Sequence, residues 1–298
     1  MTREADGASV GVNRVPCGVG MTFRAVSLGL VYVLSSLYAG HAACVRSDAV
    51  GPSIKAQPNS QAGDARSGKA GRDLARLLHN AETGDRDAQF EAGQSYENGC
   101  GVAQDYSKSA YWYRKAADSG HPGAQSSLGG MYLLGRGVEQ SDGEALKWYL
   151  RAALEGYAPA QNNVGYMYAM GRAGRNGAGV WNGDDEALKW YRKAAKAGSA
   201  AGELNVGLAY FNGNGVQQDL PESVKWFLKA AEHGSAAACD QLGRVYQHGW
   251  GTAQDYSAAD KWYQAAIERG YALAERDRSG LEEARQTAGG TPAARAAR

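Results

Sequence analysis

One pattern of small, apolar and aromatic positions repeats five times between residue 88 and about residue 271. Its clearest marks are a glycine, a tyrosine three residues later and a tryptophan 19 residues after the glycine, or 25 in the third repeat. The glycines stand 36, 36, 42 and 36 residues apart. The three sets are Gly93, Gly129, Gly165, Gly207 and Gly243; Tyr96, Tyr132, Tyr168, Tyr210 and Tyr246; and Trp112, Trp148, Trp190, Trp226 and Trp262. Self-similarity at such a period indicates a repeat protein.

Each unit predicts two helices joined by a glycine-rich turn. The first, helix A, carries its glycine in the middle, as Gly129 does in the segment 124–132. Glycine inside a helix costs about 1 kcal/mol relative to alanine, so its return in every unit predicts that another helix approaches closely there. The second, helix B, has alanine and tyrosine at helical spacing, as in 187–195. Asp105, Asp219 and Asp255 precede helix B where an N-cap is expected.

The repeat resembles the Sel1-like repeat, a relative of the tetratricopeptide repeat. The shared pattern runs from Leu-Gly-x-x-Tyr through Gly-x-Gly-Val to Ala-x-x-Trp-Tyr-x-x-Ala-Ala and a closing glycine. The resemblance implies an all-α, right-handed α-solenoid of helix-turn-helix repeats over 73–286. Repeats would start near 88, 124, 160, 202 and 238, and half-repeats at 74–84 and 271–285 would cover the two ends of the core.

The segments outside the repeats predict export. Residues 21–42 combine Arg24, an apolar run and small residues, as a secretory signal peptide does. Residues 1–20 are interpreted as an upstream extension, with Met21 as the true start. A flexible linker is expected over 43–72 and a disordered tail over 287–298. Cys44 follows the cleavage site, but His41 stands where a lipoprotein signal wants an aliphatic residue, so a soluble periplasmic or secreted protein is favoured over a lipid-anchored one.

The charge of the chain argues against nucleic acid as a partner. Lysine and arginine number 32 and the acidic residues 31. Residues 1–42 hold three arginines and two acidic residues, so 29 of each sign remain after the signal. Binding phosphates requires a basic stripe, which this balance does not predict.

The residues that usually carry catalysis or bind metals do not form a recognisable motif. Histidines after the signal fall at helix ends and turns in unrelated registers: His79, His121, His233 and His248. Cys100 and Cys239 lie four repeats apart, too far for a disulfide between them. Penicillin-binding or β-lactamase activity belongs to a branch of similar proteins with a cysteine pair in every repeat, which is absent here. We therefore expect no enzyme activity, no cofactor, no metal and no small-molecule site.

The concave face of helix A is the predicted binding surface. The positions one, four and five after the helix-A glycine share a face beside the buried side. They are apolar in the middle repeats and polar at the ends, which favours a docking strip for a peptide or helix; the alternative is that some fill the core between repeats. The predicted groove residues are Gln94, Leu133, Leu134, Tyr166, Met170, Leu208, Phe211, Asn212, Arg244 and His248.

A six-residue insertion in the third repeat supplies a second surface, a loop with Arg172, Arg175 and Trp181. The tryptophan and tyrosine columns themselves are expected to lie in the core. The combined prediction is a periplasmic scaffold or adaptor that binds a protein partner. An envelope hydrolase and a peptidoglycan or polysaccharide binder remain as alternatives.

Overall fold

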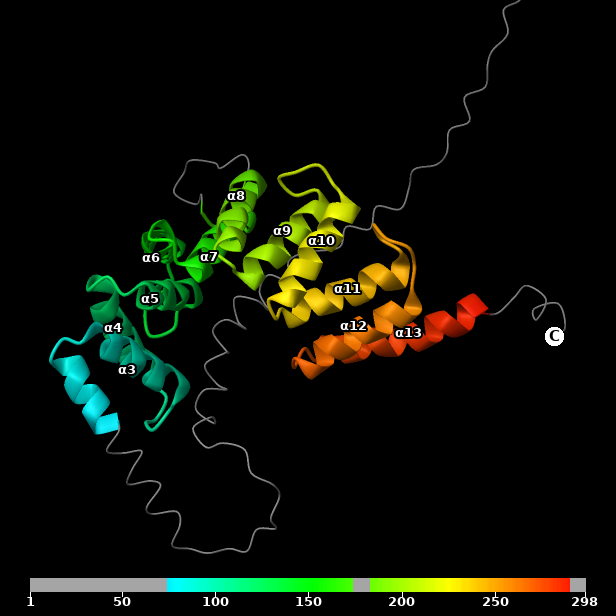
Figure 1. Ribbon diagram of the computed structural model, residues 1–298. Helices are drawn as coiled ribbons and strands as arrows, with labels where there is room; N and C mark the ends of the chain where they lie inside the picture. Colours follow the sequence, from blue (N-terminus) through cyan, green and yellow to red (C-terminus); the bar gives the residue numbers. More distant parts are fainter. Residues whose placement is uncertain (1–73, 174–182, 290–298) are drawn as a thin grey trace, which may run out of the picture.

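The computed structural model describes residues 74–173 and 183–289, and this part of the chain forms paired helices (Figure 1). The elements in chain order are a short helix over 74–82, α3 (Arg86–Asn98), α4 (Tyr106–Asp118), α5 (Pro122–Leu134), α6 (Asp142–Leu154), α7 (Ala158–Ala169), α8 (Gly183–Lys196), α9 (Ala200–Asn212), α10 (Leu220–Glu232), α11 (Ala236–His248), α12 (Tyr256–Glu268) and α13 (Leu273–Gly289). The predicted extension, signal, linker and tail lie outside the described residues, apart from the first few tail positions at the end of α13.

The helices pack in chain order, each against its neighbours, as an all-helical solenoid does. Odd-numbered helices from α3 to α11 are the predicted A helices, and even-numbered helices from α4 to α12 are the predicted B helices. The helix over 74–82 precedes the first pair and α13 follows the last, at the positions predicted for the half-repeats. None of the described helices is long and apolar enough to cross a membrane.

The mid-helix glycines mark the closest approach of the two helices in each repeat. A Cβ atom on Gly129 would lie 2.8 Å from Cδ1 of Tyr149, and one on Gly243 would lie 2.5 Å from Cδ1 of Tyr263. The equivalent glycines face the equivalent ring of their own helix B in the same way. The close approach predicted from the repeated glycine is confirmed, and the reason is that an aromatic ring occupies the space of a side chain.

The ends of the helices follow the predicted capping residues. Side chains of Asp105, Asp219 and Asp255 accept hydrogen bonds from backbone N–H groups of the first turn of helix B. Ser141 takes the same role before α6. In the turn after α5, Gly135 and the glycine two residues later both have φ +66°. A residue with a side chain would be strained in this backbone conformation.

Alanines and aromatic rings fill the space between helices. Trp112, Trp148 and Trp190 are buried, while the last two tryptophans of the column are half-buried. Tyr149 and Tyr263 are each 1% exposed. Small residues on one helix and large rings on the next produce a series of buried clusters along the array.

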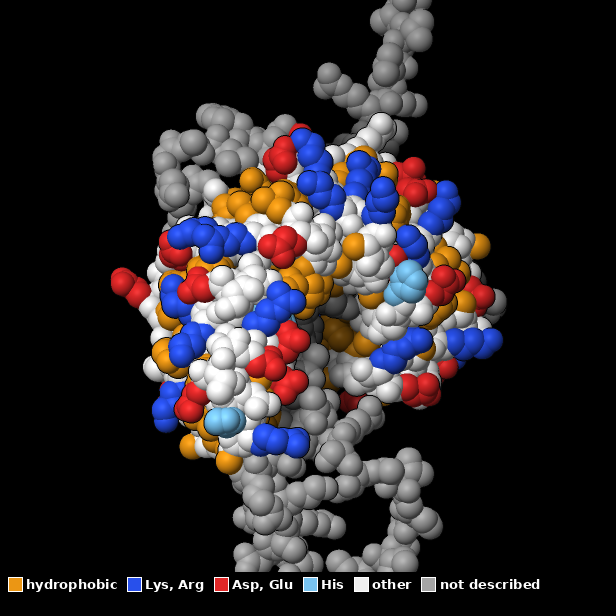
Figure 2. All heavy atoms as spheres, turned by 60° about the vertical axis from the view of Figure 1, so that its left-hand side comes forward, with side chains coloured by type: hydrophobic (Ala, Val, Ile, Leu, Met, Phe, Trp, Pro, Cys, Tyr) orange, Lys and Arg blue, Asp and Glu red, His pale blue; other side chains and the backbone are white. Residues whose placement is uncertain are grey.

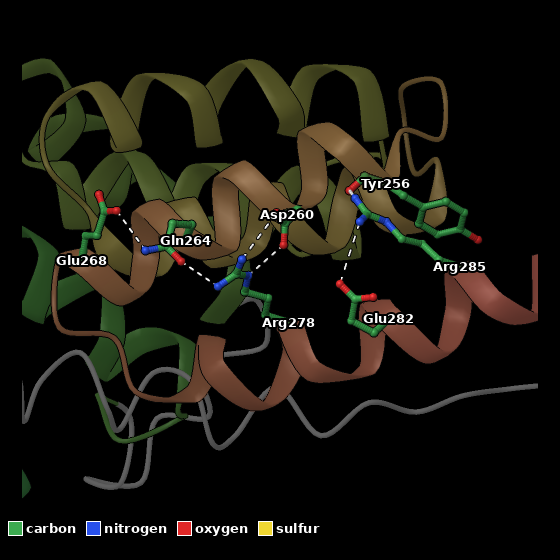
Figure 3. A network of polar contacts seen from close by, with 7 residues as sticks. All are labelled: Tyr256, Asp260, Gln264, Glu268, Arg278, Glu282 and Arg285. Atoms are coloured by element: carbon green, nitrogen blue, oxygen red, sulfur yellow. Dashed lines mark hydrogen bonds and ion pairs between the residues drawn. The ribbon is translucent and has the colours of Figure 1, made fainter.

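The last helix is attached differently, through a network of polar contacts with α12 (Figure 3). Arg278 Nε lies 2.7 Å from Asp260 Oδ1, and its Nη1 lies 2.7 Å from Gln264 Oε1. Arg285 donates to the backbone carbonyl of Tyr256 at 2.7 Å. The helix continues to Gly289, past the predicted end of the solenoid at 286.

The array curves toward its A helices. Among helices that are two apart in the chain, α7 contacts α9 and α11 contacts α13. Because these contacts join A-side helices, that side is the shorter, inner side of the curve. One face of the molecule is hollowed at its centre, with hydrophobic side chains on the inner walls (Figure 2).

Candidate protein-binding groove

Two columns of residues on the A helices form an accessible line along the inner side. They stand two residues before and five residues after the helix-A glycine, which places them two helical turns apart on one face. All are half-buried or exposed. We call them the inner strip: Ser127, Leu134, Asn163, Met170, Asn205 and Asn212.

Hydrogen bonds between side chains connect successive A helices beside this strip. Asn205 on α9 donates from Nδ2 to Oδ1 of Asn162 on α7 at 2.7 Å. Asn163 on α7 donates to Oγ of Ser126 on α5 at 3.5 Å. These bonds orient the amides, and an amide carries more donor and acceptor sites than one bond uses. A row of oriented amides suits recognition of a polypeptide backbone.

The middle of the inner side is uncharged. Helices α5 and α7 contain no Asp, Glu, Lys or Arg, and α9 contains only Glu203. Glu203 is fully buried and is held by the next helix, with Lys229 Nζ at 3.1 Å and His233 Nδ1 at 2.7 Å. Its charge therefore does not face a ligand on the strip.

The structure separates the predicted groove residues into accessible and buried ones. Exposed side chains are Gln94, Asn212 and His248; half-buried ones are Leu134, Met170, Leu208, Phe211 and Arg244. Leu133 and Tyr166 are only 2% and 5% exposed. Both belong to the buried cluster around Tyr149, so they fill the core between repeats instead of lining an open groove.

Sequence reasoning missed the column two residues before the glycine. The residue four positions after the glycine faces the aromatic ring of helix B. In the first repeat this residue is Glu97, which accepts a hydrogen bond from the hydroxyl of Tyr113 at 2.6 Å. Ser127, Asn163 and Asn205 are half-buried polar residues beside the buried glycine column. These residues stand seven positions before Leu134, Met170 and Asn212. A spacing of seven puts two residues on the same face of a helix, and this was the signal in the sequence that could have identified them.

The inserted loop is described only in part. Arg172 Nη2 pairs with Asp142 Oδ1 at 2.7 Å, which links the end of α7 to the start of α6. Arg175 and Trp181 lie outside the described residues. Arg172 thus stabilises the packing of the third repeat on the second.

Aromatic and charged side chains gather at the C-terminal end of the inner side. His248 stacks on Trp250 with ring centroids 4.4 Å apart, and Phe211 meets Trp250 edge-on at 5.5 Å. Arg244 lies between two carboxylates, 3.3 Å from Asp240 Oδ2 and hydrogen-bonded to Asp277. Trp250 was not among the predicted groove residues, although an aromatic residue in a glycine turn was visible in the sequence.

Burial changes the titration of this end of the array. Asp240 is 0% exposed, and desolvation raises its pKa to about 6 while Arg244 opposes the shift and Asp277 adds to it. Desolvation also lowers the pKa of His248, and the nearby charge of Arg244 lowers it further. The imidazole on Trp250 is therefore neutral at pH 7.

The other reactive residues are dispersed. His121 caps α5 by accepting from Ala124 N at 3.0 Å, and His233 contacts Glu203. Cys239 is a buried free thiol whose pKa is raised by burial. Within the described ranges no three His, Cys, Asp or Glu side chains come together as potential metal ligands.

A curved, one-dimensional array of paired antiparallel helices defines an α-solenoid repeat protein. The Sel1 repeat profile matches residues 86–121, 122–157, 158–199, 200–235 and 236–271, each match starting two residues before the predicted repeat start. The chain belongs to the Sel1 repeat family.

Several solved structures are similar over most of the described chain. A Sel1 repeat protein from Oxalobacter formigenes is 31% identical with a TM-score of 0.62, and the match covers 73% of this chain and 84% of that one. The protective antigen c5321 from uropathogenic Escherichia coli is 36% identical with a TM-score of 0.59, covering 70% of this chain and 43% of that one. The immunity protein Pa5087 from Pseudomonas aeruginosa shares the fold at 18% identity and a TM-score of 0.51, covering 79% and 81%. No curated protein matches the chain.

Proposed function

We propose that this chain is an exported, non-catalytic scaffold that holds a segment of a partner protein against its inner strip. The observation that carries the proposal is the uncharged inner side of α5, α7 and α9, where the inner strip presents two apolar side chains, Leu134 and Met170, beside a serine and three amide side chains. Apolar side chains favour docking by burial of surface, and amides satisfy the polar backbone that comes with a peptide.

The composition of the strip also favours a peptide over other ligands. A phosphate-rich partner would need cations along the groove, and the middle A helices supply none. A charged segment would lose hydration there without gaining a partner, which is costly. An uncharged, extended or helical segment avoids both penalties.

Export rests on the signal-like residues 21–42. The similarity to the immunity protein Pa5087 supports the fold but no partner, because its identity to this chain is 18%. The alternatives are an envelope hydrolase, which would hydrolyse a chromogenic β-lactam, and a glycan binder, which would cosediment with cell-wall sacculi.

The test compares a half-buried leucine of the inner strip with a more exposed leucine on a B helix. Leu134 ends α5 on the inner strip, whereas Leu154 ends α6 and is 76% exposed. A photo-crosslinking amino acid replaces each in turn in the exporting cell. We expect crosslinks to one defined protein from position 134 and none to that protein from position 154.

Charge substitutions give the second arm. Leu134→Glu is expected to weaken capture of the same partner at least about tenfold, because it places an unpaired carboxylate in an uncharged strip. Leu154→Glu serves as the control and leaves capture unchanged. Equal capture by both variants, with helix content preserved, would refute the inner strip as the binding surface.

A further inference from the structure

The aromatic rings at the C-terminal end of the inner side form a surface that the repeat does not require. Phe211 lies near the end of α9, His248 closes α11 and Trp250 follows in the turn, and we call the three the aromatic platform. Trp250 is 37% exposed. The equivalent turn positions hold Cys100, Arg136 and Asn214, so the turn itself does not need an aromatic residue there.

The platform is built from two adjacent repeats and continues the inner strip. Phe211 also packs against Phe227 of the core, with ring centroids 6.3 Å apart, and this contact holds the Phe211 ring in place. Asn212, a member of the strip, is the next residue along the chain. Glycines with φ +71° and +74° on either side of Trp250 determine where its backbone lies.

The charges beside the platform are already paired. The guanidinium of Arg244, one turn before His248, lies between the carboxylates of Asp240 and Asp277, so a charged ligand group would lose hydration there without gaining a counter-charge of its own. An anion would meet the negative faces of the rings. An uncharged aromatic side chain, by contrast, gains from ring contacts and from burial of its surface.

We propose that the aromatic platform is an anchor site for one aromatic side chain of the uncharged segment that occupies the inner strip. The inference rests on the proposed function and adds the chemistry of the partner. The partner segment would carry the aromatic residue at one end and uncharged residues across α5 to α9.

Phage-displayed random dodecapeptides, selected on the full chain, test the anchor. We expect the enriched peptides to share an aromatic residue at one position and to lack charged residues over the rest. Trp250→Ala is expected to weaken the best of these peptides at least about tenfold, because the largest ring of the platform is lost. Trp250→Phe keeps an aromatic face and should retain most of the affinity, and circular dichroism checks that both variants remain helical.

The strip variant separates failure of the anchor from failure of the scaffold. If the enriched peptides bind the Leu134→Glu variant more weakly but bind the Trp250→Ala variant as well as the unchanged chain, the anchor proposal is wrong and the scaffold proposal is supported. A selection that yields the same peptides on the Leu134→Glu variant would overturn both. If Trp250→Ala instead reduces cosedimentation with peptidoglycan sacculi and leaves peptide affinity unchanged, the platform is a glycan site and the proposal is wrong.

Discussion

The second repeat and the C-terminal end of the array are held together in opposite ways. In the second repeat, Gly129 lets the ring of Tyr149 lie against the backbone of α5, and the contact is one of shape. At the other end, the ion pair between Arg244 and Asp277 joins α11 to α13, and the contact is one of charge. A shape contact is insensitive to pH and salt, whereas a charge contact responds to both.

The difference follows from what each helix has to cover. Helices inside the array have a neighbour on both sides and bury small residues and rings along their whole length. Among the side chains described in α13, only Ala274 and Leu281 are fully buried, and polar contacts supply the rest of its attachment. The end helix thus depends more on polar contacts than the helices inside the array do.

Acidification gives the largest expected effect on this comparison. The pKa of Asp240 is about 6 in the folded chain and 3.8 for an ordinary aspartate, so the folded state binds the proton more tightly. The resulting stabilisation is complete below about pH 4 and is lost as pH rises through about 6. Between about pH 7 and about pH 4.5 we expect the free energy of unfolding of the C-terminal end to rise by at most about 3 kcal/mol.

Urea unfolding followed at several pH values measures this rise. Asp240→Asn removes the titrating group and should flatten the profile, because an amide does not bind the proton. The pKa of Asp260 is lowered by its hydrogen bond to Arg278. Protonation of Asp260 therefore lowers the free energy of unfolding, but only at a lower pH than the protonation of Asp240. An unchanged profile in Asp240→Asn would contradict the assignment to Asp240.

A pair of glycine substitutions gives the next effect and contrasts the two regions directly. Gly129→Ala drives a methyl group toward the Tyr149 ring, and we expect a loss of about 1–3 kcal/mol. Gly280 lies in α13, and a Cβ atom added there would have no neighbouring atom within 4 Å. Gly280→Ala should therefore stabilise by about 0.5–1 kcal/mol through helix propensity.

Urea midpoints of the two variants decide the comparison, because the substitution is chemically identical in both. Opposite signs are the expected result. A gain in stability for Gly129→Ala would mean that Tyr149 moves aside at little cost, and the close approach would not be the reason for the repeated glycine.

Removal of one side chain that joins α12 and α13 gives the smallest effect. Arg278 and Asp260 have side chains 41% and 31% exposed. We expect Arg278→Ala to lower the free energy of unfolding by about 1 kcal/mol or less, because solvent screens a half-exposed pair. The loss should shrink in about 1 M salt, where the Debye length is about 3 Å.

Lys147 provides the matched control, since it pairs with Glu144 on the surface of α6 at 3.2 Å and that pair joins no two helices. Lys147→Ala should leave the urea midpoint nearly unchanged at either salt concentration. A larger loss for Lys147→Ala than for Arg278→Ala would contradict the claim that charge attaches α13.

The sequence alone determined the order, type and spacing of the helices. Gly129 predicted a close approach, and Asp105 predicted a helix start, because both signals act over a few residues and return in most or all of the repeats. Periodicity amplifies such local signals: each unit must solve the same packing problem, so the same residue types recur.

The tertiary structure decided which inner positions a partner can reach. Leu133 and Tyr166 looked equivalent to Leu134 in the repeat pattern, yet packing between repeats buries them. The meeting of Phe211 with Trp250, and of Arg244 with Asp277, joins residues 33 or more positions apart. Their contact depends on how one repeat turns relative to the next, and that angle is set by packing between repeats, which the pattern within a single repeat does not contain.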